Sequence, residues 1–392
     1  MRMVIIMDEF KIPEDSVGLV KPQEFVFAEP PDYMKLLSGE KLGPVTLEYE
    51  TYGTLNETKD NAVLILHALS GTAHAAGYKT PSDKYPGWWD IYIGPGKAFD
   101  TSQYFIICSN VIGGCNGSTG PSSINPETGQ PYGLSFPMVT IMDMVNAQYQ
   151  LIKHLGIKKL LSVAGGSMGG MQALKWAVMY PDMVESVIAI ASSASISAQG
   201  IAFNEVGRQA IFNDPKWNGG NYYGKGAPDA GLSLARMIGH ITYMSEKIMH
   251  EKFGRNFRES GLSDYDFTRE FAVESYLHNQ GIKFVDRFDA NSYLYITRAI
   301  DFFDLVKDYG TLVDAFEKAS ANFLIVSFSS DWLYPNAMSK EIVQALRITG
   351  KNVVYADIIT DKGHDAFLLP NNVLEKNISN FLKREFEKIY DE

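Results

Sequence analysis

Short runs of β-branched and other apolar residues alternate along the chain with longer amphipathic segments. Residues 62–66 and 323–328 are continuous apolar runs, the kind found in strands that are buried on both faces. Such alternation predicts an α/β fold with a mostly parallel central sheet flanked by helices. The pattern predicts strands at residues 46–52, 62–66, 104–108, 159–163, 185–190, 323–328 and 353–359, and helices at residues 138–155, 168–180 and 373–390.

The strand pattern stops between about residues 194 and 310. This segment carries polar and aromatic residues at helical spacing, as in residues 232–244, and contains no convincing strand. It is much longer than the loops found inside compact domains. We therefore predict a core domain made of residues 1–193 and 311–392, with residues 194–310 inserted between strands as a mainly helical lid.

Composition narrows the class of protein further. The 392 residues are 45% hydrophobic and carry a formal net charge of −11, without a basic run that could bind nucleic acid. No window approaches the roughly 18 apolar residues of a membrane span, and the amino-terminal apolar stretch is too short for a signal peptide. Cys108 and Cys115 fit neither a redox pair nor a zinc site. We expect a cytoplasmic protein with reduced thiols, no metal and no membrane or nucleic-acid partner.

The clearest chemical motif surrounds Ser167. Gly165-Gly-Ser167-Met-Gly169 follows a predicted strand and precedes a predicted helix that ends before Pro181. This is the context of a nucleophile elbow, in which a serine lies on a strained turn and glycines two residues away on either side avoid steric clashes. A tight turn without catalytic function is the alternative, and the flanking strand and helix favour a nucleophile.

A nucleophilic serine of this kind needs an acid and then a histidine, each just beyond the end of a strand. Asp331 follows the strand at 323–328 by three residues, and His364 follows the strand at 353–359. His364 would accept the serine proton, and Asp331 would orient the imidazole and stabilise its charged form. Asp331 could instead be a turn residue, and Asp357 and Asp361 are weaker candidates because they lie too close to His364 in sequence.

The developing oxyanion also requires two hydrogen-bond donors. One is the N–H of Met168, directly after the serine, and the other should come from the loop after the strand at 62–66. We choose the Leu69 N–H in that loop. We expect His67, which opens the loop, to brace the turn.

Four stretches then carry a specific resemblance. They are Leu66-His-Ala-Leu-Ser-Gly-Thr-Ala-His74, residues 110–123 with Gly129-Gln-Pro-Tyr-Gly133, Gly165-Gly-Ser-Met-Gly-Gly-Met-Gln-Ala173, and Asn204-Glu-Val-Gly-Arg-Gln-Ala-Ile211. With Asp331-Trp and Gly363-His-Asp365, they span nearly the whole chain. The sequence resembles the homoserine O-acyltransferases of the α/β-hydrolase superfamily.

The resemblance implies a ping-pong reaction. Acetyl-CoA, or succinyl-CoA, would acylate Ser167, and the hydroxyl of L-homoserine would then take the acyl group, as in methionine biosynthesis. It implies that Arg208 binds the homoserine carboxylate and that Asp365 binds its ammonium group. A surface position for Arg208 and a helix-capping role for Asp365 are the alternatives. It also implies no cofactor beyond the acyl-CoA co-substrate, and a homodimer formed through the lid.

Three other functions remain open at this stage. A homoserine or serine O-succinyltransferase would use the same chemistry and differ in few residues. A carboxylesterase would pass the acyl group to water. A binding protein without catalytic activity is disfavoured, because all three positions Ser167, Asp331 and His364 are occupied by suitable residues.

Overall fold

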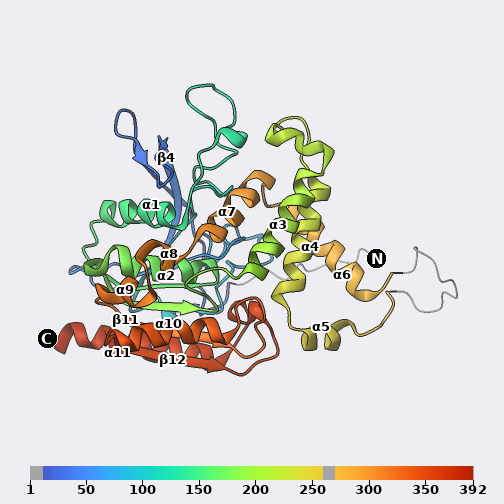
Figure 1. Cartoon of the computed structure of the whole chain (residues 1–392). Helices are drawn as coiled ribbons and strands as arrows, with labels where there is room; N and C mark the ends of the chain where they lie inside the picture. Colours follow the sequence, from blue (N-terminus) through green and yellow to red (C-terminus); the bar gives the residue numbers. More distant parts are fainter. Residues whose placement is uncertain (1–11, 259–269, 392) are drawn as a thin grey trace, which may run out of the picture.

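The computed structural model describes residues 12–258 and 270–391, and an eight-stranded sheet lies at its centre (Figure 1). The strand order is β1-β4-β8-β5-β9-β10-β11-β12. β1 and β4 are antiparallel to their neighbours, whereas β8, β5, β9, β10, β11 and β12 pair in parallel. The strands comprise β1 (Gln23–Phe27), β4 (Val45–Tyr52), β5 (Ala62–Leu66), β8 (Phe105–Ser109), β9 (Leu160–Gly166), β10 (Val184–Ile190), β11 (Asn322–Phe328) and β12 (Val353–Ile358). The predicted α/β architecture is therefore confirmed.

Alternate residues of each central strand point to opposite faces of the sheet. Both faces carry apolar side chains, and helices cover both. In β5, Leu64 packs into the core on the side of α1 (Ile141–His154), α2 (Met168–Met179) and α10 (Asn336–Ile348). Its neighbour Ile65 packs into the core on the side of α11 (Asn372–Asp391). Burial on both faces explains why these strands read as continuous apolar runs.

The predicted boundaries hold with small shifts, but β1, α10 and four strands of two residues each were missed. β9 runs three residues beyond the predicted strand, into the glycines before Ser167. β1 was missed because its short segment is mostly exposed, and α10 was missed because its apolar stripe is narrow. The remaining short strands form two separate pairs, β2 (Met34–Lys35) with β3 (Lys41–Leu42) and β6 (Ile93–Gly94) with β7 (Phe99–Asp100).

Helices and the loops between them make up the described part of the chain between β10 and β11, which contains no strand of the sheets. It contains α3 (Ala198–Phe212), α4 (Asp229–Tyr243), α5 (Glu246–Phe253), α6 (Ala272–Val285), α7 (Ala290–Phe302), α8 (Leu305–Tyr309) and α9 (Leu312–Glu317). α3, α4, α5 and α6 form a group to one side of the sheet (Figure 1). Residues 259–269 of the predicted lid lie outside the described residues.

The two ends of this insertion meet. Ser195 and Asp304 form an antiparallel bridge, and the Leu305 N–H donates to the Ala194 carbonyl at 3.0 Å. Beyond this neck, α8 returns to the core, where the buried Lys175 of α2 lies 2.6 Å from Asp308. The neck falls within the predicted boundaries at 194 and 310, and movement of the segment as a lid stays a prediction. Among the described residues, no helix is both long and apolar enough to cross a bilayer.

Candidate active site

Ser167 lies between β9 and α2 in a backbone conformation that is rare for a residue with a side chain. Its φ is 57° and its ψ is −123°. The sharp turn brings α2 against the end of β5, and a Cβ on Gly169 would lie 2.0 Å from the Leu66 carbonyl oxygen. A Cβ on Gly165 would likewise lie 2.6 Å from that oxygen. The glycines at both positions are therefore required for the turn that holds Ser167 beyond the end of β9.

The structure brings the predicted acid and base together. His364 Nδ1 lies 2.7 Å from Asp331 Oδ2, and both side chains are buried. The other carboxylate oxygen of Asp331 accepts the N–H groups of Leu333 and Tyr334 at 3.0 and 2.9 Å. Asp331 is thus both a turn residue and the hydrogen-bond partner of His364, so the two alternatives from the sequence describe the same side chain.

The charge state of His364 follows from this environment. Burial lowers its pKa, but the nearby Asp331 carboxylate, its hydrogen bond and Asp365 together outweigh burial, so the pKa is raised above 6.5. The imidazolium form is therefore stabilised, as a base that must accept a proton requires. The side chain of Ser167 interacts with that of Tyr334, which lines the same cavity.

The two predicted oxyanion donors belong to residues near Ser167. Met168 is the first residue of α2, so its N–H has no acceptor within the helix. Leu69 lines the same cavity as Ser167. His67 braces the loop as expected, because its Nδ1 lies 2.8 Å from the Ala68 carbonyl and its Nε2 accepts the Val111 N–H at 3.1 Å. Burial lowers the pKa of His67 to about 4, which keeps it neutral.

A small cavity of about 50 Å³ opens beside Ser167. Pockets that bind small molecules commonly measure about 300–1,000 Å³. This cavity is smaller than those pockets and has room only for a small chemical group. Its walls come from the loop after β5, from α3, α4 and α7, and from the loop after β11. The lining residues are Leu69, Ser167, Ile196, Gly200, Phe203, Asn204, Ile238, Gly239, Thr242, Tyr243, Tyr293, Ile300, Leu333 and Tyr334.

Arg208 is buried one helical turn beyond Asn204, a residue that lines this cavity. Its Nη2 lies 2.9 Å from Glu205 Oε2 and 2.8 Å from Asp301 Oδ2. Its Nη1 is buried and forms no hydrogen bond with any described residue. The structure therefore rules out a solvated surface position, and Nη1 leaves a donor for a ligand. Binding of a substrate carboxylate by Arg208 stays a prediction.

Asp365 follows His364 within the short 3₁₀ helix His364–Leu368, for which Gly363 is the cap residue. Burial raises the pKa of Asp365, against the opposing effect of His364 and Arg236. The capping alternative for Asp365 is therefore not supported. Arg236 of α4 was missed by the sequence reasoning, since its 3.4 Å contact with Ser70 Oγ joins segments far apart in the chain.

Other chemical groups are less suited to catalysis. Burial raises the pKa of the Cys115 thiol to about 11, so it stays protonated and is a poor nucleophile. In the part of the chain that the structure describes, no three His, Cys, Asp or Glu side chains gather in a way that could hold a metal ion.

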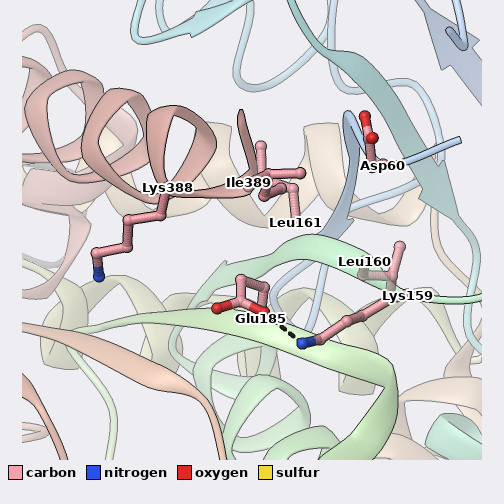
Figure 2. Close-up of a pocket in the computed structure, with 7 residues that line it drawn as sticks. All are labelled: Asp60, Lys159, Leu160, Leu161, Glu185, Lys388 and Ile389. Atoms are coloured by element: carbon pink, nitrogen blue, oxygen red, sulfur yellow. Dashed lines mark ion pairs between the residues drawn. The ribbon is translucent and has the colours of Figure 1, made fainter. Parts of the chain in front are cut away.

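A second hollow lies at the ends of two central strands (Figure 2). It is formed at the amino-terminal ends of β9 and β10 and by the end of α11, where Lys159 pairs with Glu185 and Lys388 points away from them. Ligands of open parallel sheets bind beyond the carboxyl ends of the strands, where Ser167 lies. This hollow therefore contributes nothing to the candidate active site. Its lining residues are Asp60, Lys159, Leu160, Leu161, Glu185, Lys388 and Ile389.

Comparison with known proteins agrees with this geometry. The family model described as alpha/beta hydrolase fold matches residues 61–369. The homoserine O-acetyltransferase of Methanohalobium evestigatum is 57% identical over 371 residues, which cover 95% of this chain and 75% of that protein. The crystal structure of homoserine O-acetyltransferase from Bacillus anthracis superposes with a TM-score of 0.85 at 34% identity, covering 93% of this chain and 98% of that one. Esterase E22 gives the same TM-score at 31% identity, covering 93% of this chain and 100% of its own.

The fold and the arrangement of Ser167, His364 and Asp331 thus define an acyl-group-handling enzyme of the α/β-hydrolase class. Within that class, the chain belongs to the homoserine O-acetyltransferase family of acyltransferases. The resemblance seen in the sequence is confirmed.

The raised pKa of His364 predicts a pH dependence. His364 accepts a proton only when neutral, so the rate should rise with pH through a midpoint above 6.5. Because Asp365 contributes to raising that pKa, the Asp365→Asn enzyme should show the midpoint at lower pH. The measurement is the pH profile of p-nitrophenyl acetate cleavage, which needs no amino-acid acceptor. An unmoved midpoint in the variant would contradict the coupling of Asp365 to His364.

Proposed function

We propose that this enzyme transfers an acetyl group from acetyl-CoA to the hydroxyl of L-homoserine, through an acyl-Ser167 intermediate. The observation that carries the proposal is the hydrogen-bonded pair of His364 and Asp331 beside a strained elbow serine, in a chain that belongs to this family. The product, O-acetyl-L-homoserine, would serve methionine biosynthesis. The reaction needs no cofactor beyond the acetyl-CoA co-substrate.

In the first half-reaction, His364 takes the proton of Ser167 as Oγ attacks the thioester carbonyl. The N–H groups of Met168 and Leu69 stabilise the resulting oxyanion. The carbon–sulfur bond then breaks, and CoA leaves with the proton from His364. Asp331 keeps the imidazole in place and offsets its charge while it carries that proton.

In the second half-reaction, homoserine replaces CoA, and His364 takes the proton of its hydroxyl. Arg208 would bind the carboxylate with the donor that its partners Glu205 and Asp301 leave free. Asp365 would bind the ammonium group, whose positive charge would favour the ionised form of that buried acid. Recognition of both charged groups is what would favour homoserine over water as acceptor.

An acetyl donor suits the cavity better than a succinyl donor. The cavity is small, and no Lys or Arg is among the residues that line it. A succinyl group would bring a carboxylate, which is costly to bury without a cation or other donors. The dimensions and lining of the cavity therefore favour acetyl-CoA.

The central test combines two donors with two acceptors. Acetyl-CoA or succinyl-CoA is mixed with L-homoserine or L-serine, and CoA release and the acylated product are measured in each mixture. We expect turnover mainly with acetyl-CoA and homoserine, parallel double-reciprocal lines, and an acetyl group on Ser167 in the absence of acceptor. Ser167→Ala should lower the rate by about 10⁴-fold or more, since the nucleophile is lost. An unchanged rate in this variant would contradict the mechanism.

The proposed carboxylate site has its own test. Arg208→Lys should raise the KM for homoserine at least about tenfold, because a single ammonium cannot keep the contacts with Glu205 and Asp301 and also supply the donor that Nη1 provides. The control is Arg298→Lys, since Arg298 also lies near Asp301, at 3.8 Å, but is part-exposed. The KM for homoserine should stay unchanged in the control. An unchanged KM in both variants would show that Arg208 does not bind the acceptor.

A carboxylesterase is the second candidate function, and the likeness to esterase E22 favours it specifically. An esterase would release acetate from the acyl-enzyme at the same rate with or without homoserine. The ratio of O-acetyl-L-homoserine to acetate formed at saturating homoserine therefore separates the two functions.

We also propose that two copies associate through the helical insertion. Leu234 and Ile241 are seven residues apart on one face of α4 and are 47% and 42% exposed, and Ile282 of α6 is 63% exposed. Exposed apolar residues gathered on neighbouring helices commonly mark an interface. Sedimentation equilibrium should give twice the monomer mass of 43.6 kDa, and the monomer mass at every concentration would exclude this dimer.

A further inference from the structure

Tyr334 lies closer to the reacting groups than the sequence indicates. It is in the loop between β11 and α10, three residues after Asp331, and its N–H donates to Asp331 Oδ1 at 2.9 Å. Its ring centroid lies 5.1 Å from that of His364. The side chain is 3% exposed and lines the cavity beside Ser167. Backbone and ring together hold the hydroxyl in one place at the nucleophile.

The side chains of Tyr334 and Ser167 line the same cavity and interact with each other there. Burial, with the charges of Asp331 and Tyr243, raises the pKa of Tyr334 far above its ordinary value of 10, and the contact with Ser167 offsets this only in part. The phenol therefore keeps its proton throughout the pH range in which His364 can act as a base. It is a neutral hydrogen-bond donor that does not depend on pH.

We propose that Tyr334 is a further catalytic residue, whose hydroxyl donates a hydrogen bond to Ser167 Oγ while negative charge develops on that atom. The inference rests on the acyl-serine mechanism proposed above. The amides of Met168 and Leu69 serve a different atom, the carbonyl oxygen of the acyl group. Tyr334 is thus the third donor of the site and the one directed at the nucleophile itself.

The proposed hydrogen bond acts in both half-reactions without any proton moving to or from Tyr334. In acylation, the proton of Ser167 passes to His364 as Oγ forms its bond to the carbonyl carbon. In transfer, the proton of the acceptor hydroxyl passes to His364, the bond between Oγ and the acyl carbon breaks, and Oγ recovers a proton from His364. Oγ carries partial negative charge as its bond forms and again as it breaks, and a fixed donor stabilises that charge most at those moments.

The opposite direction of the same hydrogen bond gives the opposite result. If Ser167 donated to Tyr334, the tyrosine would hold the serine proton away from His364 and slow the reaction. Removal of the hydroxyl would then speed acylation. The sign of the change in rate therefore separates the two arrangements.

Tyr334→Phe is the test, because it removes the hydroxyl and keeps both the ring against His364 and the backbone bond to Asp331. We expect the kcat for homoserine acetylation to fall about tenfold, with both KM values within about twofold, as for loss of one neutral donor. The rate constant of the p-nitrophenyl acetate burst, which reports acylation alone, should fall by the same factor. The pH midpoint of that reaction should not move, because the charges around His364 are unchanged.

Tyr180→Phe is the matched control. The Tyr180 hydroxyl also makes one side-chain hydrogen bond, at 2.6 Å to Asn146, but at the far end of α2. Its loss should leave the burst unchanged. An unchanged or faster burst in Tyr334→Phe, or a shifted pH midpoint with a lower melting temperature, would overturn the proposal. The burst needs neither acetyl-CoA nor homoserine, so it tests Tyr334 even if the wild-type enzyme fails to acetylate homoserine.

Discussion

The left-handed backbone of Ser167 is the constraint on which the rest of the site depends. A residue with a side chain holds such a conformation at a cost of about 1–3 kcal/mol, and only when its surroundings fix it. Here β9 is paired on both sides, the Ser167 N–H donates to the Ile190 carbonyl, and α2 is pressed against β5 through Gly169. The packing of the most buried part of the sheet thus offsets the conformational cost of the turn. A substitution that loosens this packing would allow Ser167 to leave its backbone conformation.

Buried charged side chains near this turn are paired with specific partners, as Asp331 and Arg208 show. Asp331 gives one oxygen to His364 and the other to two backbone amides, so its position does not depend on the protonation of the histidine. Arg208 is paired with the two carboxylates of Glu205 and Asp301, which offset its charge and allow the guanidinium to be buried. In a protein of net charge −11, such local balance takes the place of a general positive field.

The placement of the three candidate catalytic residues was predictable because topology restricts it. Ser167, Asp331 and His364 each follow the carboxyl end of a parallel strand, and neighbouring strands bring those ends together whatever the loops do. Asp301 was not predictable as a partner of Arg208, since it lies in another helix and reaches Arg208 only through packing of α7 against α3. Tyr334 is close to Asp331 in the sequence, but the direction of its hydroxyl depends on contact with the His364 ring.

The neck at Ser195 and Asp304 has a consequence for how this fold changes over time. Because the inserted helices leave and re-enter the sheet domain at one point, their sequence can diverge without disturbing strand order or the elbow. The insertion contributes Arg208 and much of the cavity wall, whereas the sheet domain contributes the nucleophile and its base. Substitutions in the insertion could therefore change the acyl acceptor from an amino acid to water, or the reverse. The sheet domain would not have to change. The crystal structures of an esterase and of a homoserine O-acetyltransferase both superpose on this chain, which agrees with such a division of roles.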